Sequence, residues 1–169
     1  MAQRHLDETR TREHHSDLKR TKLIPATRDL PPKAQCSLGR ILVVDDHETL
    51  LHAMSRMLTT VGYEVSTAAN GMRAVDLLAK GTFDVVLSDL DMPGMNGIQC
   101  LQAIRRRDSN VPVVLMTGNP DLKTAALAVE YGALQYLVKP VKMDELRQIV
   151  ARAVGLNKIA QLKRAALFI

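Results

Sequence analysis

The sequence has few cysteines and no long apolar segment, and both absences narrow the class of protein. Only two cysteines occur among 169 residues, Cys36 in a polar leader and Cys100 in a predicted helix. That number does not indicate a disulfide framework or a cysteine metal site, so we expect a reducing, cytoplasmic setting. No apolar run reaches the roughly 18 residues of a membrane-spanning helix. The first residues are charged and lack an apolar core, so we expect neither a membrane segment nor a secretory signal peptide.

The excess of basic residues lies at the two ends of the chain. The formal net charge is +5, but residues 1–40 carry nine Lys/Arg against five Asp/Glu, and residues 156–169 carry three against none. Residues 41–155 are slightly acidic, with eleven against thirteen. Nucleic-acid-binding domains gather basic residues on one folded face, so we expect no nucleic-acid binding by the central region. Three consecutive arginines, Arg105 to Arg107, end a predicted helix, where we interpret them as partners of the helix dipole.

Composition divides the chain into three parts. Residues 1–39 are polar and have no sustained apolar period, and the stretch from Pro25 to Pro32 is typical of a linker, so we predict a disordered basic leader. Residues 40–156 hold the regular apolar patterns of one domain. Residues 157–169 continue the last predicted helix as an extension. No internal repeat is evident.

Strand and helix patterns alternate five times between residues 41 and 155. Short apolar runs bounded by turn residues indicate buried strands, and apolar residues at helical spacing indicate helices that pack by one face. This alternation predicts an α/β fold, a parallel sheet with helices on both faces and right-handed crossovers. The predicted strands cover residues 41–44, 63–68, 85–87, 111–116 and 133–138, and the predicted helices cover 48–60, 72–79, 97–107, 121–131 and a last one from about 143.

The stretch from Phe83 to Gly97, FDVVLSDLDMPGMNG, holds the residue on which the functional prediction rests. Its apolar run predicts a strand buried on both faces, and a turn-rich loop follows Asp89. A carboxylate just past the end of such a strand lies at the mouth of the sheet, where open α/β folds bind ligands. We therefore expect Asp89 to be a reactive group and not part of the core.

Polar side chains also follow three other predicted strands. Asp45 and Asp46 follow the first, Thr117 the fourth and Lys139 the fifth, so a parallel sheet brings them to one edge. Adjacent carboxylates repel each other unless a cation offsets them, and Mg²⁺ prefers carboxylate and phosphate oxygens. One carboxylate can attack phosphorus, while the cation, the ammonium and the hydroxyl stabilise the equatorial oxygens. The set predicts phosphoryl chemistry.

These motifs together resemble the receiver domain of two-component response regulators, the chemotaxis-regulator-like family. The resemblance covers about residues 40–157 and includes all five strands in order. It implies a flavodoxin-like, doubly wound, five-stranded parallel sheet with strand order 2-1-3-4-5. The motifs that carry it are Ile41–Asp46 (ILVVDD), Ser88–Gly97 (SDLDMPGMNG), Met116–Gly118 (MTG) and Tyr136–Pro140 (YLVKP).

The resemblance implies a phosphorylation-dependent switch of a phosphorelay and not an enzyme with its own substrate. Asp89 would accept a phosphoryl group from the phosphohistidine of a sensor histidine kinase or from a phosphotransfer protein. Mg²⁺ would be bound by Asp45, Asp46 and Asp89 together with the backbone carbonyl of Asp91.

The resemblance also assigns the residues that would respond to the phosphoryl group. Thr117 and Lys139 would contact it, and Tyr136 would be the switch aromatic that turns inward when Thr117 moves. The Lys139–Pro140 peptide bond would be cis. The family varies two residues past the phosphoacceptor and past the switch hydroxyl, here at Asp91 and Asn119, and tunes phosphate lifetime there. Val141 follows Lys139-Pro140 where winged-helix members of the family often have Phe, which weighs against that output.

Two other functions fit part of the pattern. A haloacid-dehalogenase-like phosphatase also has an aspartate nucleophile with a second aspartate two residues later, as in Asp89 and Asp91. Pro93 stands where that motif expects Thr or Val, and the chain has no cap domain. A phosphorylation-independent interaction domain is the third alternative, and the intact set of polar residues weighs against it.

The last predicted helix continues into a seam of the coiled-coil type. Its apolar residues Ile159, Leu162, Ala166 and Ile169 are spaced 3, 4 and 3 apart. We interpret the extension as the start of a connection to an output domain, and the seam also allows a homodimer through the last helix. The stretch Leu162–Leu167 resembles linkers that precede cyclic-di-GMP phosphodiesterase domains.

Overall fold

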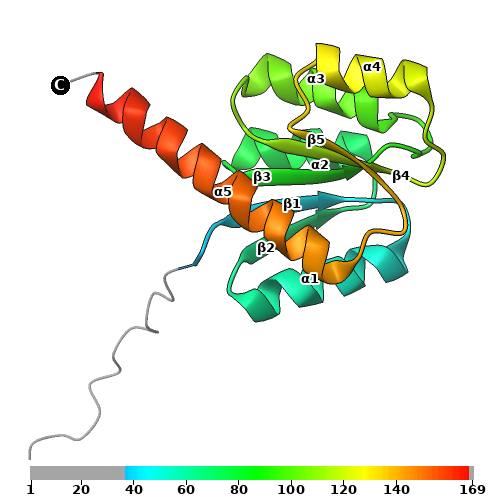
Figure 1. The fold of residues 1–169 in the computed structure, drawn as a ribbon, viewed down its shortest axis with the longest axis horizontal. Helices are drawn as coiled ribbons and strands as arrows, with labels where there is room; N and C mark the ends of the chain where they lie inside the picture. The colour runs from blue at the N-terminus through cyan, green and yellow to red at the C-terminus, as the bar shows by residue number, and fades with distance from the viewer. Residues whose placement is uncertain (1–36, 168–169) are drawn as a thin grey trace, which may run out of the picture. The chain divides into compact units, whose positions relative to one another are not determined.

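A parallel sheet between two layers of helices forms the part of the chain that the structure, a computed structural model, describes, residues 37–167 (Figure 1). The elements alternate strictly between strand and helix, as predicted from the sequence. In chain order they are β1 Arg40–Val44, α1 Glu48–Val61, β2 Glu64–Ala68, α2 Gly71–Lys80, β3 Val85–Asp89, α3 Gly97–Arg107, β4 Val113–Thr117, α4 Leu122–Glu130, β5 Gln135–Val138 and α5 Met143–Ala166.

The strand order is β2-β1-β3-β4-β5, and every neighbouring pair is parallel, which confirms the predicted topology. The three inner strands are buried almost throughout, whereas β2 and β5 at the edges are partly exposed. Inner strands of a parallel sheet are covered on both faces, so they read as continuous apolar runs. That rule is why Val85–Leu87 and Val113–Met116 were recognisable as strands in the sequence.

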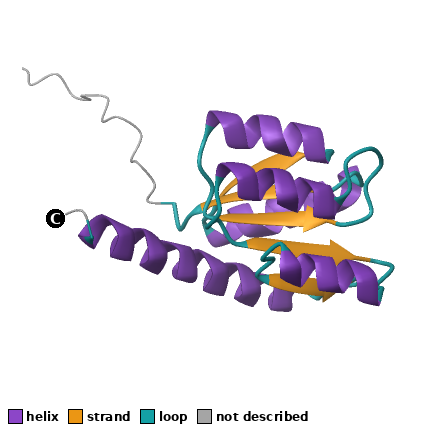
Figure 2. Ribbon diagram, turned by 90° about the horizontal axis from the view of Figure 1, so that it is seen from above, coloured by secondary structure: helices purple, strands orange, loops and turns teal. Residues whose placement is uncertain are grey.

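Helices cover both faces of the sheet (Figure 2), and alternate residues of each inner strand pack against opposite helix layers. On β1, Ile41 and Val43 pack with α1 and α5, whereas Leu42 and Val44 pack with α2, α3 and α4. The period of two along a strand produces this division. Full burial of an aliphatic side chain of this kind contributes about 1.5–3 kcal/mol, so the two layers fix the sheet firmly beneath the site.

Short polar residues and glycine set the ends of the helices. Asn96 accepts a hydrogen bond from the backbone N–H of Gln99, and the Gln99 side chain accepts one from the backbone N–H of Asn96, a capping box that starts α3. Gly62 ends α1 in the left-handed conformation with φ of 112°. Asp121 was predicted inside the fourth helix, but it is the N-cap, because its side chain accepts from the Thr124 N–H.

Arg105 does more than complement the dipole of its own helix, which was its predicted role. Its guanidinium donates hydrogen bonds to the carbonyls of Val111, Tyr131 and Gly132, at 2.8, 3.3 and 2.7 Å. Those carbonyls lie in the α3–β4 loop and at the end of α4, not at the end of α3. The side chain therefore ties α3 to α4, a long-range role that the local sequence did not indicate.

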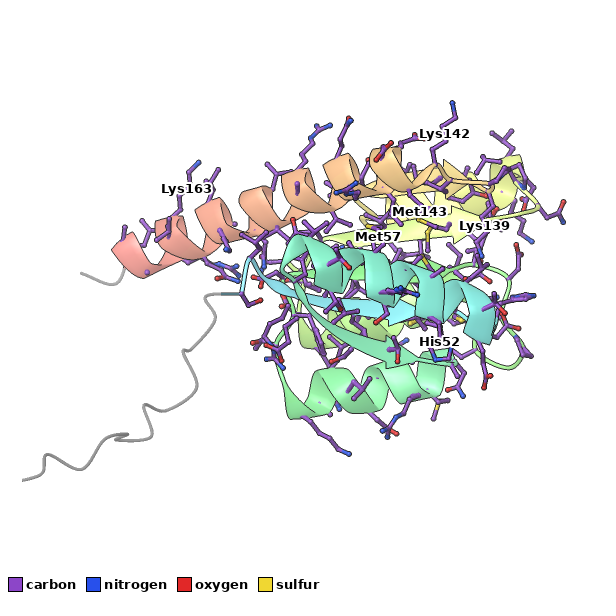
Figure 3. All side chains as sticks on the ribbon, turned by 90° about the horizontal axis from the view of Figure 1, so that it is seen from below. His52, Met57, Lys139, Lys142, Met143 and Lys163 are labelled. Carbon is purple, nitrogen blue, oxygen red and sulfur yellow. The ribbon has the colours of Figure 1, made fainter. Side chains whose placement is uncertain are left out.

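The predicted helical extension is present, since α5 continues without a break to Ala166 (Figure 1). Its contacts with the domain include Asn157, which is buried and donates a hydrogen bond to Asp84, and Lys158, whose Nζ donates to the carbonyl of Leu38 at 2.7 Å. Further along, Ile159 and Leu162 of the predicted seam are 52% and 71% exposed, and Lys163 projects from the same segment (Figure 3). Ile169 and the predicted leader up to residue 36 lie outside the described residues, and the boundaries at 39 and 156 stay predictions.

Within residues 37–167, none of the helices combines the length and the apolar character that crossing a membrane requires.

Candidate functional site

The strand register brings the predicted site residues to the carboxyl edge of the sheet. Val44 of β1 pairs with Ser88 of β3, so Asp45 and Asp89 come next to each other. Asp89 itself pairs with Met116, which places Thr117 beside it on β4. Thr117 in turn pairs with Val138, and Lys139 follows. Four strands that are distant in sequence therefore each contribute one polar group to the same place.

Lys139 lies between the two inner carboxylates. Its Nζ is 2.9 Å from Oδ2 of Asp45 and 2.8 Å from Oδ1 of Asp89. Burial alone lowers the pKa of the Lys139 ammonium, but the contacts with Asp89 and Asp45 outweigh burial, so its pKa lies above the ordinary value. The lysine therefore carries its positive charge at neutral pH. The peptide bond between Lys139 and Pro140 is cis.

The inner carboxylates are more deeply buried than the sequence suggested. Asp89 was expected just past the end of its strand, but it is the last residue of β3 and only 2% exposed, and Asp45 is fully buried. A buried carboxylate is tolerated only with a charged or hydrogen-bonding partner, and Lys139 supplies it. Asp89 therefore has almost no exposed surface, although it lies at the carboxyl end of its strand and lines a polar cavity.

The arrangement fits a divalent cation. Asp45, Asp46, His47 and Asp89 each offer a ligand atom, and these atoms lie within 4.8 Å of one another. Oδ1 of Asp89 is buried and lies 2.8 Å from the Lys139 ammonium, but among residues 37–167 no other donor reaches it. Three carboxylates against one ammonium leave negative charge and free oxygen lone pairs, which hard divalent ions require.

His47 belongs to this cluster, although sequence reasoning did not select it. Its Nδ1 lies 3.1 Å from Oδ1 of Asp46 and 3.4 Å from Oδ1 of Asp45. The signal was its position directly after the two aspartates.

The Thr117 hydroxyl is engaged by the side chain of Asp91, for which only a backbone role was expected. Oγ1 of Thr117 donates to Oδ2 of Asp91 at 2.7 Å and accepts from the backbone N–H of Asn119 at 3.0 Å. Tyr136, the predicted switch aromatic, is half-buried, and its hydroxyl lies 3.0 Å from Oγ1 of Thr124 at the start of α4. The two predicted switch residues thus have separate partners in this conformation.

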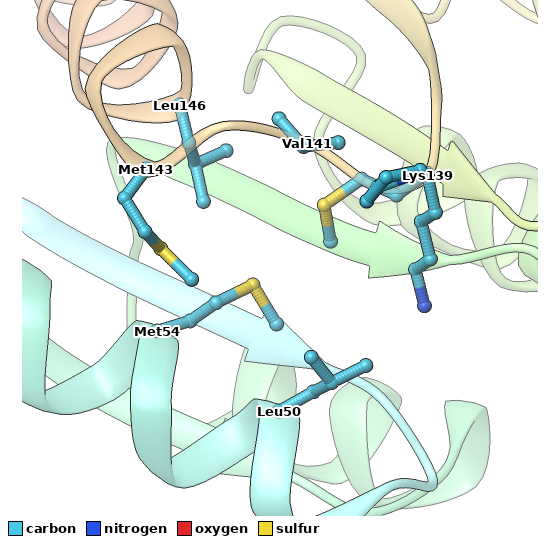
Figure 4. A pocket seen from close by; sticks show the side chains of 8 residues that line it. Leu50, Met54, Lys139, Val141, Met143 and Leu146 are labelled. Atoms are coloured by element: carbon cyan, nitrogen blue, oxygen red, sulfur yellow. The ribbon is translucent and has the colours of Figure 1, made fainter.

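Two cavities adjoin the site. One, of about 600 Å³, is lined by polar groups that include His47, Asp89, Asp91 and Lys139. The other, of about 520 Å³, lies between α1 and the start of α5 (Figure 4). Its lining is mostly apolar and consists of Leu50, Met54, Met116, Lys139, Pro140, Val141, Met143 and Leu146. Leu50 and Lys139 line both cavities, so a partner on the apolar one would lie beside the carboxylates.

Comparisons with known proteins agree with this geometry. The family model described as the response regulator receiver domain matches residues 41–151. The regulatory protein AtoC of Escherichia coli is 39% identical over 123 residues, which cover 73% of this chain and 27% of AtoC. Sporulation initiation phosphotransferase F of Bacillus subtilis is 35% identical over 118 residues, which cover 70% of this chain and 95% of that protein.

A solved structure is similar over the same region. The response regulator protein TrrA of Thermotoga maritima, in complex with Mg²⁺-BeF, is 32% identical with a TM-score of 0.62, and the match covers 68% of this chain and 97% of that one. The chain spans only about a quarter of the length of AtoC and of the transcriptional regulator NtrC of Escherichia coli, at 27% and 25%. The matched region, the strand order and the acidic pocket agree, and the chain belongs to the response regulator receiver domain family.

Proposed function

We propose that this domain is a phosphorylation-controlled switch in which Asp89 accepts a phosphoryl group from a phosphohistidine. The donor would be a sensor histidine kinase or a phosphotransfer protein. The observation that carries the proposal is the Asp89 carboxylate, which is buried, 2.8 Å from the Lys139 ammonium and open to a polar cavity. An ordinary carboxylate on the protein surface would have neither a paired ammonium nor burial from solvent.

The reaction is a transfer between two groups and needs no other reactant. A carboxylate oxygen of Asp89 attacks phosphorus, the bond from phosphorus to the imidazole nitrogen breaks, and an acyl phosphate forms on Asp89. Lys139 is placed to leave its contact with Asp89 and pair with an oxygen of the transferred group. The transition state spreads charge over the equatorial oxygens, so a fixed ammonium beside them lowers the barrier.

Asp45, Asp46, Asp89 and the backbone carbonyl of Asp91 would hold Mg²⁺. The bound ion would supply positive charge to the phosphoryl oxygens. The carboxylate cluster supports this assignment, and so does the buried Oδ1 of Asp89, which only Lys139 approaches among the described residues.

Thr117 would transmit the change. Phosphorylation adds roughly −1.5 to −2 of charge and strong acceptor oxygens, which compete with Asp91 for the Thr117 hydroxyl. Movement of Thr117 would make room for Tyr136 to leave Thr124 and turn inward, and α4 and β5 would shift with it. The hydrogen bonds Thr117–Asp91 and Tyr136–Thr124 would then mark the resting state.

The apolar cavity beside the site suits the donor protein. It shares Leu50 and Lys139 with the polar cavity, so a protein seated on it would hold its phosphohistidine close to Asp89. The exposed residues Ile159 and Leu162 on α5 support a connection to an output domain or a homodimer along this helix. A cyclic-di-GMP phosphodiesterase is one such output.

The test is labelling of the full chain with a small phosphodonor. Acetyl phosphate or phosphoramidate with Mg²⁺ should label the protein at one site, and Asp89→Asn should abolish the label. Asp76→Asn, an exposed aspartate on α2, is the matched control and should label normally. Retained labelling in Asp89→Asn would refute the proposal.

The same assay separates the alternatives. No label on a folded wild-type chain would favour an interaction domain that works without phosphorylation. Steady release of phosphate from a phosphomonoester, lost in Asp89→Asn, would favour a phosphatase. Chelation of Mg²⁺ should prevent labelling if the acidic cluster has the proposed role.

A further inference from the structure

We propose that His47 is a ligand in the acidic pocket and raises its affinity for divalent transition ions that accept imidazole, such as Ni²⁺, Fe²⁺ or Zn²⁺, relative to Mg²⁺. This inference deepens the proposed function and rests on it, because it concerns the same cation site. It assigns the choice of metal to one residue outside the carboxylate set.

The position of the imidazole suits a shared ion. Nδ1 of His47 lies 3.1 Å from Oδ1 of Asp46 and 3.4 Å from Oδ1 of Asp45. Two neighbouring ligands on an octahedral ion with bonds of about 2.1 Å are about 3.0 Å apart. The nitrogen and the two carboxylate oxygens therefore already have the spacing of ligands on one ion, with small adjustments.

The backbone holds His47 in place, and its ring stays exposed, with Nδ1 within hydrogen-bond distance of Oδ1 of Asp46 at 3.1 Å. The backbone N–H of His47 donates to Oδ1 of Asp45 at 2.8 Å. His47 is also the N-cap residue of α1, but its side chain makes no capping hydrogen bond within the described region. The ring is 68% exposed and lines the polar cavity. Its contacts with the aspartates are thus not explained by a role in starting the helix.

A second observation points to a cation at the same place. Asp89 is 2% exposed, and within the described residues the Lys139 ammonium, 2.8 Å away, is the one group that its Oδ1 pairs with. Lys139 is shared with Asp45, so one positive charge faces two buried carboxylates and leaves negative charge uncompensated. Ligation of an ion shared with Asp45, Asp46 and His47 would offset it.

The chemical consequence is selectivity. Mg²⁺ prefers oxygen ligands and gains little from an imidazole, whereas Zn²⁺, Fe²⁺ and Ni²⁺ bind imidazole well. A pocket of carboxylates alone would bind divalent ions in their general order of affinity. The His47 imidazole would raise the affinity for the transition ions specifically.

The experiment measures Ni²⁺ and Mg²⁺ binding to the full chain by calorimetry. The leader contains His5, His14 and His15, which bind Ni²⁺ themselves, so all variants carry alanine at those three positions. In this background His47→Ala should affect the two affinities unequally. The factor by which Ni²⁺ affinity falls should be about tenfold or more larger than the factor for Mg²⁺. The matched control is His52→Ala, an exposed histidine on α1 (Figure 3), which should change neither.

A spectroscopic readout locates the ion. Paramagnetic Ni²⁺ should broaden the NMR signals of the His47 ring and of the amides near Asp89, and the His52 ring should broaden less. Equal losses of Ni²⁺ and Mg²⁺ affinity in His47→Ala, or no loss of either, would mean that His47 only hydrogen-bonds to Asp46 and would overturn the proposal. Labelling of Asp89 with Mg²⁺ and acetyl phosphate tests the proposed function separately, so the two can fail independently.

Discussion

At the scale of single residues, the Thr117 hydroxyl has one proton to donate and gives it to Asp91 at 2.7 Å. A hydrogen bond to a charged acceptor contributes about 1.5–3 kcal/mol. In the proposed function, a phosphoryl group on Asp89 would have to take Thr117 away from this partner, so Asp91 would hold the switch in its resting state. The sequence did not indicate whether the acidic side chain at 91 would favour or disfavour the phosphorylated state. The geometry indicates that it would disfavour that state.

We predict that Asp91→Ala binds beryllofluoride, a phosphoryl mimic, about tenfold more tightly than wild type, which corresponds to 1.4 kcal/mol. The alanine frees the Thr117 hydroxyl, removes one negative charge near the anion and keeps the backbone carbonyl at 91. Asp91→Asn retains a hydrogen-bond acceptor without the charge. Its beryllofluoride affinity should lie between those of wild type and Asp91→Ala. Calorimetric titration in the presence of Mg²⁺ gives the affinities, and weaker binding by Asp91→Ala would contradict the resting-state role.

At the scale of elements, the start of α3 lies against the end of β3. A Cβ at Gly97 would meet the carbonyl oxygen of Asp89 at 2.5 Å and Cα of Leu90 at 2.7 Å. Both are backbone atoms, which cannot turn aside as a side chain can. Glycine at 97 is therefore what lets the helix approach the strand that carries Asp89.

We predict that Gly97→Ala lowers the free energy of unfolding by about 2–3 kcal/mol, as overpacking against rigid backbone does. Gly155→Ala in α5 is the matched control, since its Cβ would meet nothing within 4 Å among the described residues. Helix propensity should make that variant up to about 1 kcal/mol more stable. Urea unfolding measures both, and equal effects would contradict the close approach at Gly97.

Arg105 couples two further elements, α3 and α4, through three carbonyl oxygens of other segments. We predict that Arg105→Ala costs about 2 kcal/mol of unfolding free energy, because three carbonyls, two of them in part-buried contacts, lose a charged donor. Arg106→Ala, on the exposed side of the same helix, should cost less than about 0.5 kcal/mol. If urea unfolding shows the same loss of unfolding free energy for both variants, the arginines act only through the helix dipole.

The elements also show how far the sequence could be interpreted. Apolar runs on the inner strands are dictated by burial on both faces, so the strands and the convergence of Asp45, Asp89, Thr117 and Lys139 were predictable. The strand order followed from the family resemblance. The Asp91–Thr117 hydrogen bond was not, because it depends on loop conformations that no period encodes. The same holds for Arg105, whose acceptors are 26 and 27 residues away at Tyr131 and Gly132.

At the scale of the whole molecule, one buried thiol links stability to pH. Burial raises the pKa of Cys100 to about 11 from 9.0, against a lowering by a hydrogen bond with Ser88. The folded state therefore keeps the thiol protonated after the unfolded state has begun to lose its proton. Stability from this source is complete below pH 9 and falls as the pH rises toward 11.

We predict that the unfolding free energy of wild type falls by about 2–3 kcal/mol more than that of Cys100→Ala between pH 9 and pH 11, from the shift of two units at 1.36 kcal/mol each. Comparison with this variant cancels the contribution of Lys139, whose raised pKa acts in an overlapping range. Denaturant titrations at several pH values measure the difference. Parallel curves for the two proteins would show that the thiol does not respond to burial in this way.

The bridge between Lys139 and Asp45 spans 94 residues of chain, and this has a consequence for biosynthesis. Ribosomes release a protein from its N-terminus, so the aspartates leave the ribosome long before the lysine that neutralises them. Parallel strands can pair only after the intervening crossovers have emerged, which makes such sheets slow to form. An unfinished chain therefore displays the acidic residues without the assembled site, and only a chain translated past Lys139 can bring the lysine and the carboxylates together.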